Sequence, residues 1–203
     1  MMRRKYRWKC LLVLLPLLLG VGCGERGKVE QGRVIDFYKT KGTVTVIRDS
    51  SPDRKKPEYT ALPPFTCQIP TKPSEMGAEP KSGYRMKLDT EKNEITIFDP
   101  ASGRFKTIRF TLVDRKENIA KDNDLVFDKA RKESRKFPVV DRAKRTISIY
   151  SARQKLLVTF TVPDEYLSLP EKAWDAGDEV RLYCKEGGKA ARLMNISKTD
   201  IFQ

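Results

Sequence analysis

Residues 94–112 of this chain read EITIFDPASGRFKTIRFTL, and this stretch decides the class of fold. Polar and apolar side chains alternate over residues 94–98 and again over residues 104–112, which is the pattern of a strand with one buried face. Residues 99–103 between them contain Pro, Ser and Gly, which favour turns. The stretch therefore predicts two β-strands joined by a turn.

The same alternation recurs along the rest of the chain, with turn residues between the alternating segments. We expect an all-β fold, mostly antiparallel, with one or two short helices. It would form two small five-stranded barrel-like halves, or one fused β-barrel or sandwich. The further predicted strands are residues 43–47, 84–88, 146–150, 156–162, 179–183 and 190–196.

Two internal similarities suggest different duplications. Residues 83–88 (GYRMKL) resemble residues 177–182 (GDEVRL), which would relate a first half, residues 33–103, to a second half, residues 104–203. A shorter similarity relates residues 89–98 to residues 141–150, which share the spacing Asp-x₅-Ile. The two similarities have different offsets along the sequence, so they cannot both result from one duplication.

Two regions interrupt the strand pattern. Residues 50–81 hold seven of the twelve prolines, so we expect a Pro-rich loop over the surface. Residues 164–176 (DEYLSLPEKAWDA) predict a short helix that packs Trp174 inward.

The composition excludes several kinds of chemistry. The 203 residues include 41 Lys and Arg, 27 Asp and Glu, four Cys and no His. The absence of histidine excludes Ser-His-Asp and Cys-His catalysis, His-ligated zinc and CxxCH haem attachment. The cysteines form no CxxC pair, and the chain has no Gly-rich nucleotide-binding motif. We therefore expect no metal site, no cofactor and no catalytic residues.

The N-terminus is basic and then apolar. Residues 1–9 carry five basic and no acidic side chains, and residues 11–22 (LLVLLPLLLGVG) are uncharged, which is too short for a membrane span but typical of a signal peptide. With Gly22 before Cys23, this segment resembles a bacterial lipoprotein signal.

That resemblance implies cleavage after residue 22, acylation of Cys23 and a flexible tether over residues 23–32. It also implies a bacterial envelope lipoprotein, and Gly24 favours the outer membrane, facing the periplasm. Acyl chains are sufficient to hold a protein at a membrane. Ordinary secretion with a free Cys23 is the alternative.

Removal of residues 1–22 leaves 36 basic and 27 acidic residues, a net charge of +9. Export implies an oxidising compartment, in which Cys67 and Cys184 could form a disulfide. Two separate buried thiols are the other interpretation.

The densest positive charge of the mature chain lies in residues 129–145, here called the basic segment. Its cations could attract an anionic surface such as lipid head groups or an acidic glycan, or could simply be solvated. The envelope location argues against nucleic acid, which such cations could also bind. The eight basic residues are Lys129, Arg131, Lys132, Arg135, Lys136, Arg142, Lys144 and Arg145.

These observations favour a non-catalytic envelope lipoprotein, a binding or scaffolding module that contacts an anionic or protein partner. One alternative is a histidine-free hydrolase that uses Asp and Glu carboxylates. Another is a carrier of an apolar ligand inside a β-barrel. Candidate carboxylates are Asp89, Glu91, Glu94, Asp175, Asp178 and Glu179, and candidate barrel-lining residues are Phe98, Phe110, Tyr150 and Phe160.

Overall fold

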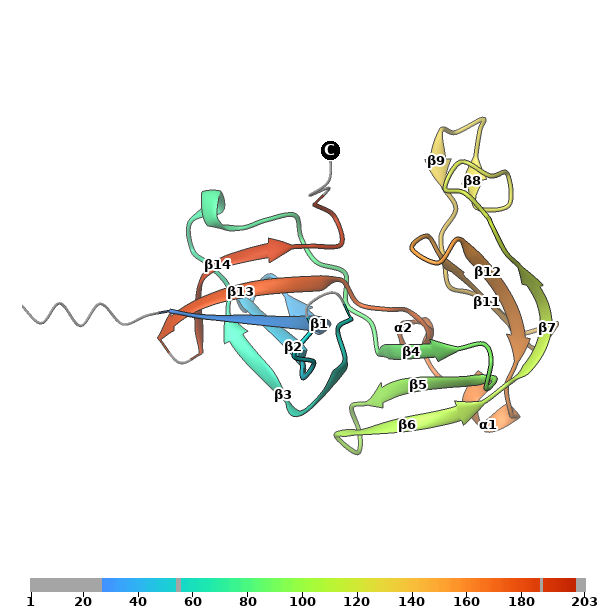
Figure 1. Ribbon diagram of the computed structural model, residues 1–203, viewed down its shortest axis with the longest axis horizontal. Helices are drawn as coiled ribbons and strands as arrows, with labels where there is room; N and C mark the ends of the chain where they lie inside the picture. Colours follow the sequence, from blue (N-terminus) through green and yellow to red (C-terminus); the bar gives the residue numbers. More distant parts are fainter. Residues whose placement is uncertain (1–26, 54–55, 187, 200–203) are drawn as a thin grey trace, which may run out of the picture.

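The computed structural model describes residues 27–53, 56–186 and 188–199 (Figure 1). The fold is mostly β with largely antiparallel sheets and two short helices, as predicted. All eight predicted strands are present. The strands divide into a five-stranded ring and a second lobe made of strand meanders (Figure 1).

The ring joins strands from both ends of the described chain. Its order is β1-β13-β14-β3-β2, and β2 pairs with β1 again. All its pairings are antiparallel except that of β14 with β3, a short parallel contact between Lys189 and Gln68. The bounds are β1 (Lys28–Tyr38), β2 (Thr43–Asp49), β3 (Tyr59–Gln68), β13 (Glu179–Glu186) and β14 (Lys189–Asn195).

Alternate residues of these strands point into the ring and fill it with apolar side chains. The buried cluster contains Val34, Val44, Val46, Cys67, Val180, Leu182, Cys184, Ala190 and Leu193. The four residues proposed to line a ligand-carrying barrel are not members of this cluster. Phe98, Phe110 and Phe160 are buried elsewhere, and Tyr150 is half-buried.

Two sequence predictions are wrong within the ring. The predicted tether, residues 23–32, ends early because β1 begins at Lys28 and pairs with β13. The predicted Pro-rich loop, residues 50–81, contains the ten-residue strand β3. Pro63 and Pro64 are tolerated because they lie where the β2–β3 register shifts and ladder hydrogen bonds are interrupted.

The second lobe, here the meander lobe, spans residues 84–174. One three-stranded sheet has the order β4-β5-β6, and a second sheet has the order β10-β11-β12-β7. Their apolar faces pack together, with the rings of Phe110 and Phe160 4.5 Å apart. The bounds are β4 (Arg85–Asp89), β5 (Glu94–Asp99), β6 (Arg104–Arg109), β7 (Thr111–Lys116), β10 (Val139–Asp141), β11 (Thr146–Ser151) and β12 (Leu156–Thr161), with a small hairpin of β8 (Phe127–Asp128) and β9 (Glu133–Ser134).

The two meanders of this lobe have the same register. Ile95 pairs with Ile108 in the first, and Ile147 pairs with Phe160 in the second, a constant offset of 52 residues. Left-handed backbone also recurs at this offset, at Asn93 and Arg145 and again at Gly103 and Lys155. The shorter of the two sequence similarities therefore corresponds to a repeated structural unit.

The longer similarity does not describe a repeated unit. Residues 83–88 lead into β4 of the meander lobe, whereas residues 177–182 lead into β13 of the ring. The predicted division at residues 103 and 104 falls inside the β5–β6 hairpin, and the ring takes strands from both predicted halves. The division fails because β1 and β3 each have one pairing partner from the C-terminal part of the chain, β13 and β14 respectively.

The lobes meet at a close backbone crossing and an apolar junction. A Cβ atom on Gly177 would lie 1.8 Å from the carbonyl oxygen of Val34, so this crossing admits only glycine. Ile35, Ile47 and Tyr59 of the ring pack there with residues of β4 and β5. Helix α2 (Glu171–Trp174) contacts β4 and β5 near this junction, and its Trp174 is fully buried, as predicted, while helix α1 (Asp164–Leu167) packs on the core of the meander lobe. No helix in the described ranges is long and apolar enough to cross a membrane.

Candidate functional site

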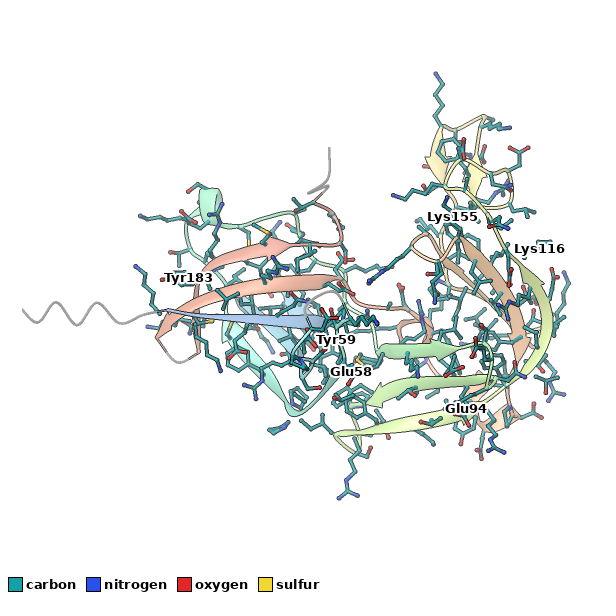
Figure 2. All side chains as sticks on the ribbon, viewed as in Figure 1. Glu58, Tyr59, Glu94, Lys116, Lys155 and Tyr183 are labelled. Carbon is teal, nitrogen blue, oxygen red and sulfur yellow. The ribbon has the colours of Figure 1, made fainter. Side chains whose placement is uncertain are left out.

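A cleft lies between the ring and the meander lobe. It consists of two adjoining hollows of about 630 Å³ and 890 Å³ that share five residues of their lining. The ring contributes residues of β1, β3 and β13, and the meander lobe contributes β4 and the β11–β12 turn. Tyr59 and Glu58 mark the end of the ring that faces this cleft (Figure 2). Hollows of this size are typical of ligand sites.

The cleft is strongly cationic. Seven basic side chains line it against three acidic ones, a net charge of +4 if all are ionised. The bases come from both lobes, so a ligand in the cleft would contact both. The basic residues are Arg33, Lys56, Lys81, Arg85, Lys87, Lys121 and Arg153, and the acidic residues are Glu58, Asp178 and Glu179.

Arg33 of β1 is held in place at the centre of the cleft. Its Nη2 donates to Glu179 Oε1 at 3.0 Å, and its Nη1 donates to the carbonyl oxygen of Met86 at 2.9 Å. The guanidinium also lies 4.4 Å from the ring centroid of Tyr59, where a cation is attracted to the aromatic face. These contacts join three ring strands to β4 and fix a positive charge at the floor of the cleft.

Arg85 of β4 lies beside Arg33, and its positive charge is less well neutralised than that of Arg33. Its Nε donates to the carbonyl oxygen of Trp174 at 2.9 Å, and no ion pair in the described part of the chain neutralises its charge. Burial lowers the pKa of the Arg85 guanidinium to about 10, and the positive charge of Arg33 acts in the same direction. An anion in the cleft would relieve both effects.

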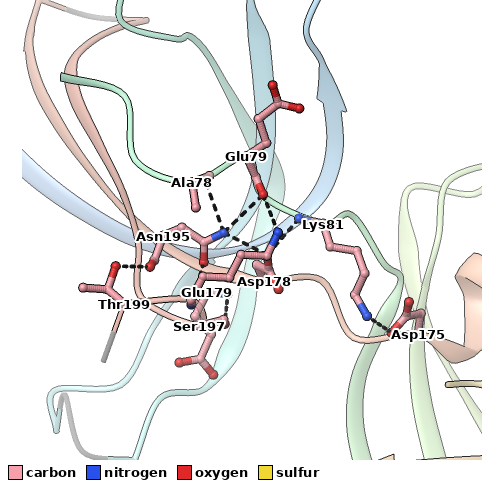
Figure 3. A network of polar contacts seen from close by, with 10 residues as sticks. Ala78, Glu79, Lys81, Asp175, Asp178, Glu179, Asn195, Ser197 and Thr199 are labelled. Carbon is pink, nitrogen blue, oxygen red and sulfur yellow. Dashed lines mark hydrogen bonds and ion pairs between the residues drawn. The ribbon is translucent and has the colours of Figure 1, made fainter. Parts of the chain in front are cut away.

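Asp178 lines the ring side of the cleft, and Asn195 supports it from behind in a network of polar contacts (Figure 3). Asp178 Oδ2 accepts hydrogen bonds from Asn195 Nδ2 at 2.8 Å and from the Lys81 backbone nitrogen at 2.9 Å. Lys198 Nζ lies 3.7 Å from the same oxygen. Both Asp178 and Asn195 are buried, so this network holds the C-terminal strand to residues 78–81 and keeps the Asp178 oxygen fully engaged.

The other candidate carboxylates also have partners within the described part of the protein, except Glu91, which is exposed in the β4–β5 turn. Asp89 Oδ1 accepts hydrogen bonds from the backbone nitrogens of Glu91 and Lys92 in the β4–β5 turn. Glu94 pairs with Arg109 at 3.4 Å. Asp175 pairs with Lys81 at 2.8 Å, although burial raises the pKa of the Asp175 carboxyl above its usual range. These carboxylates therefore have structural roles, because they accept hydrogen bonds or ion pairs that stabilise turns and contacts between segments.

The structure divides the basic segment instead of gathering it. All eight of its basic side chains are exposed. Arg131, Arg135 and Lys136 line a surface hollow of about 670 Å³ beside the β8–β9 hairpin, while residues 142–145 form the separate β10–β11 turn. Several pair with nearby acids, among them Lys129 with Asp124 at 2.7 Å. None of the eight lines the cleft.

The structure brings Cys67 and Cys184 together inside the ring. Both are buried free thiols of the same apolar cluster, and they are near enough for each to affect the pKa of the other. Burial, with the neighbouring Cys184, raises the pKa of the Cys67 thiol to about 12. Cys23, the predicted lipidation site, lies outside the described residues.

The sequence did not identify the cleft. Its cations come from seven separate positions between residues 33 and 153, and none belongs to the basic segment. One signal was present: Gly83 and Gly177 each precede a predicted strand, and the two glycines touch at the crossing between the lobes. The sequence alone does not show that these two glycines meet, because their contact depends on strand pairing between distant parts of the chain.

No curated protein and no solved structure matches the chain. A family model described as "Domain of unknown function (DUF4881)" matches residues 25–203. This match includes every described strand of both lobes and the whole cleft lining. The chain therefore belongs to the DUF4881 family.

Proposed function

We propose that this protein is a non-catalytic envelope lipoprotein that binds an anionic ligand in the cleft between its lobes. An acylated Cys23 would hold it at the membrane, with the outer membrane the favoured location. The ligand would carry several negative charges, such as the phosphates or carboxylates of a lipid head group or glycan. Fixed positive charges that are already in place bind such a ligand without the cost of ordering flexible side chains.

The observation that carries this proposal is the pair Arg33 and Arg85. Two guanidinium groups share a half-buried position while the nearby Glu179 neutralises only Arg33. A buried charge without a partner is costly, and a guanidinium can bind a carboxylate or phosphate through two parallel hydrogen bonds. An anion that contacts Arg85 would supply the missing charge.

The absence of catalysis is supported by the engagement of the acids. Glu179 is paired with Arg33, and Asp178 accepts hydrogen bonds from two nitrogens. A glycosidase-type pair needs one carboxylate that takes up a proton and one that stays charged across a cleft. Carboxylates held by cations and backbone donors suit the walls of a binding site better.

The anchor is supported by the N-terminal segment and by the extent of the family match. Residues 1–23 carry the lipoprotein-type signal, and the match begins at residue 25. The matched domain thus starts next to the proposed acylated cysteine.

The test is isothermal titration of the mature protein with inorganic pyrophosphate, a compact probe with several charges. We expect binding that weakens with salt, and at least a tenfold loss of affinity in Arg85→Gln, because a hydrogen bond to a charged group contributes about 1.5–3 kcal/mol. Arg104→Gln is the matched control, because it removes the same charge as Arg85→Gln. Arg104 is exposed and lies outside both hollows.

Lys87→Gln with Lys121→Gln gives a second variant that does not disturb a buried group, since both side chains are exposed at the cleft. It should also weaken pyrophosphate binding while the unfolding temperature stays unchanged. Equal affinities for wild type, both cleft variants and Arg104→Gln would overturn the cleft as the binding site.

A further inference from the structure

The end of the ring opposite the cleft carries an apolar and basic patch. Val29 of β1 pairs with Tyr183 of β13, and Tyr183 pairs in turn with Arg192 of β14. These three side chains form a row across the outer face of the ring, and Val29 is 52% exposed. Tyr183 marks this end of the ring, well away from Tyr59 at the cleft end (Figure 2).

A shallow basic hollow of about 520 Å³ adjoins this row. Lys72, Lys185 and Arg192 line it, and all three are exposed. Glu75 is the acidic residue of the lining and lies 3.7 Å from Arg192, so the hollow keeps an excess of positive charge. Val29, Lys72, Tyr183, Lys185 and Arg192 are here called the ring-end patch.

The chain enters the fold directly over this patch. Gly27 lies against the Tyr183 ring, since a Cβ atom on Gly27 would be 2.4 Å from it. Cys23 is five residues before Lys28, and five residues can span at most about 17 Å. If Cys23 is acylated, Lys28 must therefore lie within that distance of the membrane surface, and Lys28 is the neighbour of Val29 in the patch.

We infer that the ring-end patch docks onto the anionic phospholipid head groups of the membrane that holds the acyl chains. This inference rests on the proposed acylation of Cys23. Tyr183 and Val29 would enter the head-group region, where a tyrosine places its ring in apolar and its hydroxyl in polar surroundings. Lys72, Lys185 and Arg192 would lie at the phosphates, whose attraction for each cation is additive.

Docking by this patch gives the protein one orientation. A single anchor at Cys23 does not determine which end of the domain faces the lipid, whereas a second contact beside that anchor does. The cleft, at the opposite end of the ring, then faces away from the membrane and stays open to its ligand.

The test places a fluorescent reporter in the patch of the acylated protein. Trp174 is buried and is the only tryptophan after residue 22, so it gives a constant background. We expect brominated phosphatidylglycerol to quench Tyr183→Trp at least twice as strongly as Tyr38→Trp. Tyr38 is the matched control because it is exposed at the other end of β1.

A second measurement removes the anchor. Cys23→Ser protein should still partition onto vesicles that contain phosphatidylglycerol, and Lys185→Gln with Arg192→Gln should lower this partition by roughly fivefold for each charge removed. Arg142→Gln with Lys144→Gln removes equal charge from the basic segment and should change the partition less than twofold.

The outcomes separate the docking from the anchor. If the acylated protein sediments with vesicles while Tyr183→Trp is quenched no more than Tyr38→Trp, the docking is overturned and the anchor stays intact. Equal losses from the patch and basic-segment variants also overturn the docking, in favour of the basic segment. A mature protein without acyl mass at Cys23, absent from the membrane fraction, overturns the anchor and the docking together.

Discussion

The ring and the meander lobe are both β-sheet structures, but only the ring is closed by pairing between the N-terminal and C-terminal parts of the described chain. In the ring, Lys28 pairs with Cys184, and Gln68 pairs with Lys189, so two of its five pairings join distant parts of the chain and close the ring. In the meander lobe, β4-β5-β6 and β10-β11-β12 are successive hairpins. Long-range pairing lets the ring place side chains from several segments at one point, whereas local hairpins place charges along exposed turns.

The charges follow this difference. Arg33 is fixed by contacts with Glu179, Met86 and Tyr59, which come from three separate segments. Arg131 is exposed and lies 3.9 Å from Glu133, its neighbour two residues away. Equal formal charges should therefore differ in their contribution to stability and in their use for binding.

The largest expected effect comes from breaking the crossing that holds the two regions together. Gly177→Ala would place a methyl group 1.8 Å from the Val34 carbonyl oxygen, so the crossing must open and we expect no stably folded protein. Gly103→Ala is the control, since nothing lies within 4 Å of its Cβ position and its left-handed φ of +66° should cost only about 1–2 kcal/mol. Circular dichroism and limited proteolysis measure both, and a folded, protease-resistant Gly177→Ala would contradict the tight crossing.

The next largest effect concerns the ring alone. We expect the exported protein to hold Cys67 and Cys184 as a disulfide, formed when a disulfide-bearing oxidase takes up their two electrons by thiol–disulfide exchange. The bond closes a loop of 117 residues and should raise the free energy of unfolding by roughly 4–5 kcal/mol. Because burial raises the pKa of both thiols, they should react slowly once the protein is folded and reduced.

Urea unfolding with and without reductant measures this stabilisation, and thiol counting after denaturation detects the bond. Cys67→Ala with Cys184→Ala serves as the control, because reductant should leave its unfolding midpoint unchanged. Two reactive thiols in the denatured, non-reduced protein would contradict the disulfide.

A smaller effect compares the two kinds of cation directly. Arg33→Gln leaves Glu179 without its cation in a half-buried position, which should cost about 2 kcal/mol. Arg131→Gln removes an exposed cation and should change stability by less than about 0.5 kcal/mol. Urea unfolding of the two variants gives the difference, and equal losses would mean that fixed and exposed charges contribute alike.

The same contrast explains what the sequence could predict. Strands β5, β11 and β12 show clear alternation because their faces are half-buried, and their hairpins are marked by turn residues. The first five residues of β1 fall in the predicted tether, because Lys28, Glu30 and Gln31 hide the alternation there and the partner strand β13 is far away in the sequence. The cleft could not be predicted for the same reason, since Arg33 and Arg85 become neighbours only through the crossing at Gly177.

The smallest expected effect tests the equivalence of the two meanders. Asp89 and Asp141 occupy matching turns, and each accepts a backbone hydrogen bond from the residue three positions later, at 3.0 Å and 2.9 Å. These bonds hold the pKa of both carboxyls below the usual range. Their stabilisation is therefore complete above the unfolded-state value, about pH 3.9, and is lost as the pH falls through the lower folded-state pKa.

Asp89→Ala and Asp141→Ala should therefore lower the melting temperature by similar amounts at pH 7. Each difference from the wild type should disappear once acidification protonates the carboxyl in the folded protein, below its lowered pKa. Asp122→Ala is a suitable control, because Asp122 is exposed in a turn outside both meanders. Unequal losses, or a loss that persists in acid, would show that Asp89 and Asp141 do not stabilise their matching turns in the same way. Equal losses would mean that the repeat preserves the contact that fixes each turn, and with it the local folding that distinguishes this lobe from the ring.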